Sequence, residues 1–269
     1  LFYLIMGLTR RIVVFGGNGF VGQNVIKTAL QAGINVTSIN RSGEPSNFRW
    51  EGKTTAAVKW CVGDIMNAGS WVHEISEVCG AISCVGAFGS DEFMEKVNGD
   101  ANIRAISEAL NAGIPRFVYV STVENNLPSF FLKGYFNGKR RAEQALLDAY
   151  PTTGVVLRPG FIYGSREIPN PAPSAVKAVV GSTIKIPLGL LGKPLETVFS
   201  TAPMSKLRAT LPGMQAILAP PIAVQCLARV AVAGAIGSID LQTTGNILKI
   251  EDIVRESRSV DWEILLSVS

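Results

Sequence analysis

A tyrosine and a lysine four residues apart, Tyr135 and Lys139, have the residue types and spacing best suited to chemistry. Side chains at positions i and i+4 of a helix lie on one face and can interact. A phenol with a pKa of about 10 exchanges protons poorly at neutral pH, and a neighbouring ammonium lowers that pKa toward a usable range. The pair therefore suits proton exchange with a carbonyl or hydroxyl while hydride moves to or from a nicotinamide. The alternative interpretation is an ordinary helix face.

A glycine-rich stretch near the start of the chain offers a place for such a cofactor. A β-branched run leads into Gly16, Gly19 and Gly22, and an amphipathic segment follows. One glycine permits a tight turn, one lets the backbone approach a pyrophosphate, and one lets the new helix pack on the sheet. The helix N-terminus then favours the negative diphosphate. This pattern predicts a dinucleotide-binding loop, with contacts from Gly16, Gly17, Asn18, Gly19, Phe20, Val21 and Gly22.

The end of the second predicted strand indicates which dinucleotide binds. Sites that prefer NAD place an acidic residue there to bind the ribose 2′-hydroxyl, but this chain has Arg41 and Ser42 instead. An arginine can make a bidentate contact with a 2′-phosphate, and the serine can add a hydroxyl. The sequence therefore favours NADPH over NADH. If Arg41 is only a solvated loop charge, the cofactor choice stays open.

Asp64 and Ile65 follow the third predicted strand. A carboxylate at this place in a dinucleotide site can accept a hydrogen bond from the adenine amino group. It can equally cap the start of a helix. The sequence does not separate these two interpretations.

Strand-like and helix-like segments alternate along the chain and must position these residues. Alternation of this kind indicates βαβ units and a parallel sheet covered on both faces. Strands are expected at 11–15, 35–39, 58–62, 81–85, 116–120 and 154–157. Helices are expected at 19–32, 70–78, 91–112, 135–149 and 222–235, and a short strand at 247–250 should return to the main body.

The predicted fold class is α/β, a doubly wound parallel Rossmann sheet with a small C-terminal lobe. The expected domains are an N-terminal extension at 1–10, a dinucleotide-binding domain at 11–160 and a substrate or partner lobe at 161–269. The lobe begins in a stretch rich in proline and glycine, which is too irregular for another βαβ unit. The 269 residues, 47% of them hydrophobic, can bury one sizeable core.

Composition argues against several other classes of protein. The 25 basic and 21 acidic residues give a net charge of +4 without a dense basic block, so no nucleic-acid partner is expected. The four cysteines have no metal-ligand spacing, and we expect reduced, packed thiols and no metal. His73 is the only histidine and lies in a predicted exposed helix, which argues against Ser-His-Asp hydrolysis.

The first six residues, Leu1 to Met6, are apolar. They are too few to span a bilayer, which takes about 20 apolar residues, so no transmembrane span is expected. The segment is either the remnant of a targeting sequence or a contact with a membrane surface.

Taken together, the motifs resemble the short-chain dehydrogenase/reductase superfamily, in its extended and atypical branches, from Arg11 to about Val232. Within it, the chain resembles an atypical subgroup of plant and fungal organelle proteins that includes the fungal coenzyme Q biosynthesis factor of this fold. The Rossmann-type accessory subunit of complex I is a more distant relative. The matching segments are Gly16 to Gly22, Gly63-Asp64, Cys84 to Ala87, Asn98 with Asn102, Phe117 to Ser121, Tyr135 with Lys139, and Arg158 to Gly164.

The resemblance implies a Rossmann fold, NAD(P)H binding and roles for particular side chains. Tyr135 would exchange the proton, and Lys139 would also hold the nicotinamide ribose. Ser121 or Thr122 would orient the substrate oxygen. Further cofactor contacts are implied at Val85, Gly86, Ala87 and Pro159.

Two function classes follow. The resemblance places both in mitochondria, either in the matrix or at a membrane, and a plastid is the alternative location. The first is an NADPH-dependent reductase for an apolar carbonyl, quinone or isoprenoid-like ring, with aromatic residues that either line its pocket or belong to the core. The second is a non-catalytic NADPH-bound accessory or assembly subunit of an organelle membrane complex, docking through apolar or proline-rich segments. The aromatics are Phe130, Phe131, Phe136, Phe161 and Tyr163, and the docking segments are Leu1 to Met6, Ile168 to Pro194 and Trp262 to Leu266.

A third class, the sugar-nucleotide epimerases and dehydratases, shares the fold and the tyrosine-lysine pair. Its members normally carry a longer C-terminal nucleotide-binding lobe than the residues after Arg158 supply. We therefore expect it less than the other two.

Overall fold

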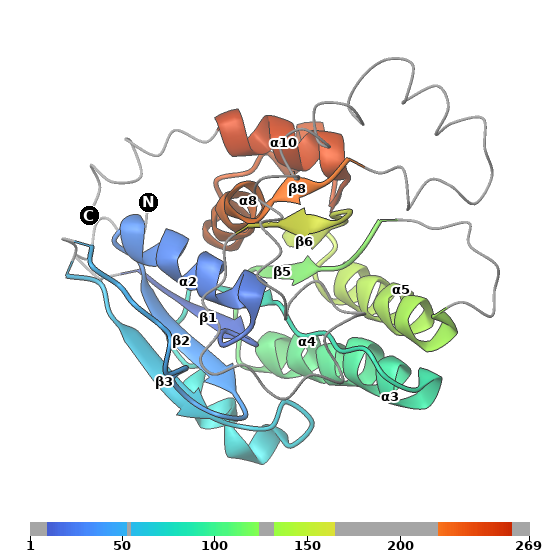
Figure 1. Ribbon diagram of the computed structural model, residues 1–269, viewed down its shortest axis with the longest axis horizontal. Helices are drawn as coiled ribbons and strands as arrows, with labels where there is room; N and C mark the ends of the chain where they lie inside the picture. The colour runs from blue at the N-terminus through green and yellow to red at the C-terminus, as the bar shows by residue number, and fades with distance from the viewer. Residues whose placement is uncertain (1–9, 53–54, 124–131, 165–219, 260–269) are drawn as a thin grey trace, which may run out of the picture.

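A seven-stranded parallel sheet forms the centre of the protein in a computed structural model that describes residues 10–52, 55–123, 132–164 and 220–259 (Figure 1). The strand order is β3-β2-β1-β4-β5-β6-β9. Because the order reverses between β1 and β4, a crevice opens there at the carboxyl ends of the strands. The strands are β1 (Arg11–Phe15), β2 (Asn35–Asn40), β3 (Val58–Val62), β4 (Gly80–Ser83), β5 (Phe117–Val120), β6 (Gly154–Leu157) and β9 (Ile247–Leu248), and β7 (Ile162–Tyr163) pairs separately with β8 (Ile222–Ala223).

Helices cover both faces of the sheet, which makes it doubly wound (Figure 1). Successive side chains of a strand point to opposite faces, and β1 shows this: Ile12 and Val14 join one core cluster, whereas Val13 and Phe15 join the other. The first cluster packs under α2 (Phe20–Gln31), α8 (Val224–Ile236) and α10 (Ile250–Ser259). The second packs under α4 (Ala101–Asn111) and α5 (Lys133–Ala149). The shorter helices are η1 (Ala68–Ser70), η2 (Val72–Glu74), α3 (Asp91–Glu95), the π-helical η3 (Lys96–Asp100) and α9 (Leu241–Thr244).

The predicted doubly wound α/β sheet is confirmed, but the helix predicted at 70–78 is wrong. Only the short turns η1 and η2 form there. The Trp71 side chain is fully buried and its indole nitrogen donates to the Asp64 carbonyl, 3.0 Å away, which pins the segment to the loop before it. Glu77 then takes a left-handed conformation with φ of 57°, which ends any helical continuation. His73, in η2, is 65% exposed in its side chain.

The segment at 247–250 does return to the main body, although only Ile247–Leu248 forms a strand, paired with β6. The helix predicted at 222–235 is present as α8. Residues 1–9 and most of the predicted C-terminal lobe lie outside the described ranges, and so do Phe130, Phe131, Ile168 to Pro194 and Trp262 to Leu266. Within the described ranges, no helix combines the length and apolarity needed to cross a membrane.

Candidate functional site

The glycine loop joins β1 to α2 as predicted. Gly16 has φ of +76°, a conformation that L side chains rarely adopt, and its amide donates to the Ile39 carbonyl at 2.9 Å. A Cβ at Gly22 would lie 2.3 Å from the Gly16 oxygen, and one at Gly17 would lie 2.1 Å from Ser38 Oγ. The backbone of this loop therefore packs closely against β2 and against itself, as a dinucleotide-binding loop requires. No acidic residue occupies the first turn of α2, so its free amides are available to an anion.

The end of β2 meets this loop through side-chain hydrogen bonds. Asn18 Nδ2 donates to Ser42 Oγ at 2.7 Å, and the Ser42 amide donates to Asn40 Oδ1 at 3.0 Å. Arg41 is exposed and forms no ion pair with any described residue. The structure thus holds Ser42 against the glycine loop and leaves the Arg41 guanidinium free for a phosphate.

Asp64 closes a turn and does not cap a helix, because the N-cap of the next helical turn, η1, is Asn67. Asp64 Oδ1 accepts from the Met66 amide at 3.0 Å, which fixes the turn after β3. Ile65 packs against the core cluster that contains Trp71. The second oxygen of Asp64, in an exposed carboxylate, accepts no hydrogen bond from a described residue, and the adenine contact stays a prediction.

Two buried asparagines shape the loop after β4, where Val85, Gly86 and Ala87 lie. Asn98 Nδ2 donates to the Ala87 carbonyl at 2.9 Å, and Asn98 Oδ1 accepts from the Ala87 amide at 3.2 Å. Asn102 Oδ1 accepts from Ser83 Oγ at 2.6 Å. Asn98 lies in η3, and π-helical turns occur frequently at functional sites. The four-residue spacing of the asparagines is a signal that could have predicted this role.

Lys139 reaches from α5 to the carboxyl ends of β4 and β5. Its Nζ donates to the Val120 carbonyl at 2.8 Å and lies 3.5 Å from the Val85 carbonyl. The ammonium also lies 4.8 Å from the centre of the Tyr119 ring. Burial lowers the pKa of Lys139 to about 8. The lysine therefore ties the ends of two central strands together next to the loop of Gly86.

Tyr135 lies on the same face of α5, but its pKa does not move as predicted. The centre of its ring is 5.9 Å from Lys139 Nζ, and the ring stacks on Phe88 at 4.9 Å with an interplanar angle of 11°. Burial raises the pKa of Tyr135, whereas a hydrogen bond with the Thr122 side chain and the charge of Arg140 lower it. Burial is the largest of these effects, and the lowering expected from Lys139 is not among them, so the predicted shift is wrong in direction. The phenol is therefore protonated at neutral pH.

The two hydroxyl residues after β5 take different places. Ser121 is buried, and its Oγ donates to the Glu143 carboxylate. The Thr122 side chain instead lies near enough to the Tyr135 phenol to lower the pKa of Tyr135. Of the two residues proposed to orient a substrate oxygen, Thr122 is thus the one beside the candidate proton donor.

Glu143 is a site residue that the sequence analysis missed. Its carboxylate, 4% exposed, accepts from Ser121, from Arg140 Nη1 and from Arg158 Nη2 at 2.6 Å. Arg140 Nη2 also donates to the Thr122 carbonyl at 2.6 Å. This Glu143 cluster, formed by Ser121, Arg140, Glu143 and Arg158, fixes the chain that carries Thr122. The signal was available, because Glu143 is four residues after Lys139 and so shares its helix face.

The remaining predicted site residues lie around these groups. Pro159 is buried after β6, and its carbonyl accepts from the Val123 amide at 2.9 Å. Phe136 packs edge-on against Tyr135, with ring centres 5.2 Å apart. Tyr163 is buried, whereas Phe161 is 50% exposed. A contact of Pro159 with a nicotinamide stays a prediction.

The stability difference between Lys139→Met and wild type is expected to depend on pH. Burial lowers the pKa of Lys139 from 10.5 to about 8, so between these values the unfolded chain binds more protons at this residue than the folded protein does. Wild-type stability therefore gains from a rise in pH across this window, and the variant does not. One pKa unit corresponds to about 1.4 kcal/mol. Across this pH window, the unfolding free energy of wild type should therefore rise relative to that of the variant by up to about 3 kcal/mol.

Urea unfolding of both proteins at about pH 7 and about pH 10 measures this shift. Lys133→Met, at an exposed position of the same helix, is the control for the added methionine. A Lys139→Met difference that stays constant with pH would show that the ammonium is not buried.

Comparisons with known proteins agree with this geometry. A family described as NAD(P)H-binding matches residues 16–184. The chloroplastic protein At1g32220 of Arabidopsis thaliana is 40% identical over 254 residues, 93% of this chain and 79% of that protein. The mitochondrial protein fmp52 of Emericella nidulans is 27% identical over 65% of this chain and 76% of its own length. A putative NAD-dependent epimerase/dehydratase from Bacillus halodurans shares the fold, with a TM-score of 0.56, 15% identity and coverage of 93% of this chain and 100% of that one. The chain therefore belongs to the NAD(P)H-binding family of Rossmann-fold proteins.

Proposed function

We propose that the protein is an NADPH-dependent reductase whose Tyr135 supplies the proton. One observation carries this proposal: Thr122, Tyr135 and Lys139 meet at the carboxyl ends of β4 and β5, beside the strand-order reversal where dinucleotides bind in such sheets. The close glycine backbone and the free amides of α2 fit a diphosphate at the same edge.

The chemistry is the reduction of a carbonyl or quinone. NADPH, when bound, supplies a hydride and leaves as NADP⁺. The substrate oxygen accepts a hydrogen bond from Thr122 and takes its proton from the Tyr135 hydroxyl, so that a carbonyl becomes a hydroxyl. Lys139 would hold the nicotinamide ribose, and its ammonium would keep positive charge near the tyrosinate that remains. Water then returns the proton to Tyr135.

Exposed aromatic side chains support an apolar substrate such as a quinone or isoprenoid-like ring. Phe88, 53% exposed, lies parallel to the Tyr135 ring, and Phe93, from α3, is 44% exposed. Large exposed apolar side chains near a site commonly mark where a ligand binds. Their stacking faces suit a planar ring better than a charged sugar nucleotide.

An organelle is the proposed location. The Arabidopsis relative, named chloroplastic, is 40% identical over most of the chain, whereas the Emericella relative, named mitochondrial, is 27% identical over less of it. This difference favours a plastid over the mitochondrion that the sequence analysis put first.

A second candidate is a non-catalytic NADPH-bound accessory or assembly subunit of an organelle membrane complex, of the complex I type. One observation favours it: Phe88 and Phe136 cover the Tyr135 ring, and burial raises the phenol pKa. Such a protein would bind NADPH without turnover and would migrate with a large complex in a native gel of organelle extract.

A substrate panel separates the two candidates. NADPH oxidation is followed with short-chain quinones, apolar aldehydes and, as polar controls, sugar aldehydes. The reductase predicts saturable turnover with an apolar member of the panel. Tight NADPH binding with no oxidation by any member would support the accessory subunit.

Arg41→Ala is expected to weaken NADPH binding by about 10- to 100-fold, because a charge-assisted hydrogen bond contributes about 1.5–3 kcal/mol. NADH lacks the 2′-phosphate, so its affinity should change less than threefold, roughly the effect of an exposed charge. Titrations of both cofactors measure the ratio. Arg104→Ala, which removes an exposed arginine of α4, is the matched control. Equal weakening of NADPH and NADH would contradict the assignment of Arg41 to the phosphate.

A further inference from the structure

Lys139 is a buried cation whose hydrogen bonds to described residues use only two of its donors. An ammonium has three N–H donors. Lys139 donates to the Val120 carbonyl at 2.8 Å and to the Val85 carbonyl at 3.5 Å, which is longer than is usual for such a bond. Burial disfavours the charged form of an amine. A further partner is therefore needed to hold this side chain in place as an ammonium.

The ring of Tyr119 supplies that partner. Lys139 Nζ lies 4.8 Å from the ring centre, within the roughly 6 Å at which a cation is attracted to an aromatic face. Tyr119 is fully buried in the core cluster under α4 and α5, so water does not weaken this attraction. The Tyr135 ring is farther from Nζ, at 5.9 Å, and it stacks on Phe88.

The hydroxyl of Tyr119 fixes this ring to the loop after β4. It donates to the Asn98 carbonyl at 3.0 Å, in the π-helical turn η3. The Asn98 side chain in turn bonds both the amide and the carbonyl of Ala87. A Cβ at Gly86 would lie 3.0 Å from Asn98 Oδ1 and 3.6 Å from Lys139 Nζ, so both side chains border the same glycine. Tyr119 thus contacts the lysine and the asparagine that enclose this loop.

We propose that Tyr119 is a positioning residue: the face of its ring holds Lys139 at the carboxyl ends of β4 and β5 and keeps it an ammonium. Lys139 then carries its positive charge beside the loop of Gly86, where the proposed function places the nicotinamide ribose. This consequence for the cofactor rests on the proposed function, whereas the contact between Tyr119 and Lys139 does not.

Three other titratable side chains act on the charge of Lys139. Cys84, after β4, is a neutral thiol, because burial raises its pKa to about 12. Arg140 and Glu143 belong to α5 and have opposite effects on the pKa of Lys139, since Arg140 lowers it and Glu143 raises it. Burial is the largest effect and brings that pKa to about 8. Loss of the Tyr119 ring should therefore lower the pKa of Lys139 further.

The pKa of Lys139, measured by NMR on the full chain with ¹³C-labelled lysine and no cofactor, tests the proposal. The Lys139 signal is the one that Lys139→Met removes. Tyr119→Leu removes the ring and should lower the pKa from about 8 to about 7, whereas Tyr119→Phe keeps the ring face and should leave it unchanged. Tyr150→Leu, which removes another buried ring of the same core cluster, should also leave it unchanged.

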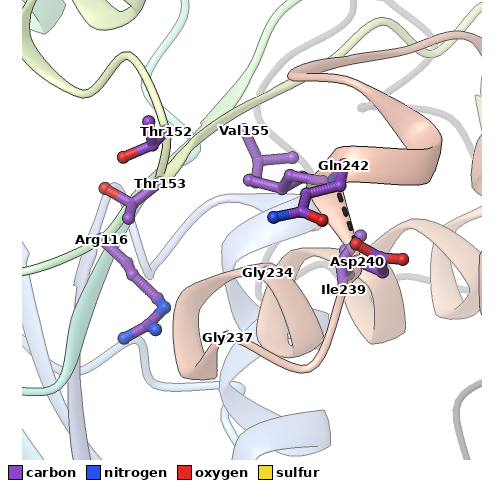
Figure 2. A pocket seen from close by; sticks show the side chains of 10 residues that line it. Arg116, Thr152, Thr153, Val155, Gly234, Gly237, Ile239, Asp240 and Gln242 are labelled. Atoms are coloured by element: carbon purple, nitrogen blue, oxygen red, sulfur yellow. Dashed lines mark hydrogen bonds between the residues drawn. The ribbon is translucent and has the colours of Figure 1, made fainter.

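Arg116→Gln is the control for a change of charge at the other end of β5. Figure 2 shows Arg116 at a pocket of about 190 Å³, which lies at the amino ends of β5 and β6. Four residues of strand, about 13 Å, separate Arg116 from Val120, and this exceeds the Debye length of about 10 Å at 0.1 M salt. The variant should therefore leave the pKa of Lys139 unchanged.

A fluorinated ring separates the electrostatic effect from an effect on folding. A trifluorinated phenylalanine at position 119 keeps the shape of the Tyr119→Phe side chain but withdraws electron density from the ring face, so it should lower the pKa of Lys139. The proposal is overturned if neither Tyr119→Leu nor the fluorinated ring lowers that pKa, or if Tyr150→Leu or Arg116→Gln changes it as much. If the pKa falls as expected but the wild-type protein binds no NADPH, the proposed function fails and the positioning of Lys139 by Tyr119 stands.

Discussion

Glu143→Ala is expected to lower the free energy of unfolding by about 3–5 kcal/mol, the usual cost of removing one partner of a buried ion pair. The carboxylate is 4% exposed and is shared by Arg158 and Arg140, which are 11% and 32% exposed. Removing it leaves the Arg158 guanidinium buried without its carboxylate and takes away the acceptor of the Ser121 hydroxyl. Urea unfolding at neutral pH measures the loss.

Two further variants make this result specific. Glu108→Ala breaks the exposed pair between Arg104 and Glu108, 3.6 Å apart, and should cost less than about 1 kcal/mol. Glu143→Gln keeps the shape and one carbonyl acceptor and should fall between the two. If Glu143→Ala costs no more than Glu108→Ala, the Glu143 cluster does not hold the end of β5.

Tyr135→Phe is expected to reduce turnover by about 10²- to 10⁴-fold, the usual contribution of a positioned general acid. The ring contacts with Phe88 and Phe136 survive in phenylalanine, so NADPH affinity should change less than about twofold. Steady-state rates with the best member of the substrate panel, together with NADPH titration, separate the two effects.

Tyr150→Phe is the matched control for loss of a hydroxyl. The Tyr150 hydroxyl is buried without a hydrogen-bond partner among the described residues, and it lies at the end of α5 away from the crevice. Removing an unsatisfied buried hydroxyl should leave turnover unchanged and stability unchanged or raised. Equal loss of rate in both variants would mean that Tyr135 acts through the fold and not as the proton donor.

Local patterns in the sequence were enough to predict the parallel sheet and the glycine loop. The β-branched run of β1 and the spacing of Gly16, Gly19 and Gly22 depend on neighbours in the sequence, and the structure agrees with both. The helical face that carries Tyr135 and Lys139 was predictable for the same reason.

Features that depend on distant residues were not predictable in this way. The pattern of polar and apolar residues at 70–78 is typical of a helix. However, Trp71 is buried against Phe15, with 5.0 Å between ring centres, and two short turns form in place of the helix. The spacing of Glu143 from Lys139 places it on the same helix face, but its partners Ser121 and Arg158 follow β5 and β6 and are brought to it only by the fold. The Tyr135 pKa likewise follows from its burial under Phe88, which no spacing in the sequence shows.

Titration of the wild-type protein with NADPH, followed by the fluorescence of the reduced nicotinamide, tests the central claim most directly. We predict saturable binding at one site per chain, reversed by NADP⁺ and weaker for NADH. The absence of saturable binding, or binding that NADP⁺ does not reverse, would contradict the placement of a dinucleotide at the Gly16 to Gly22 loop.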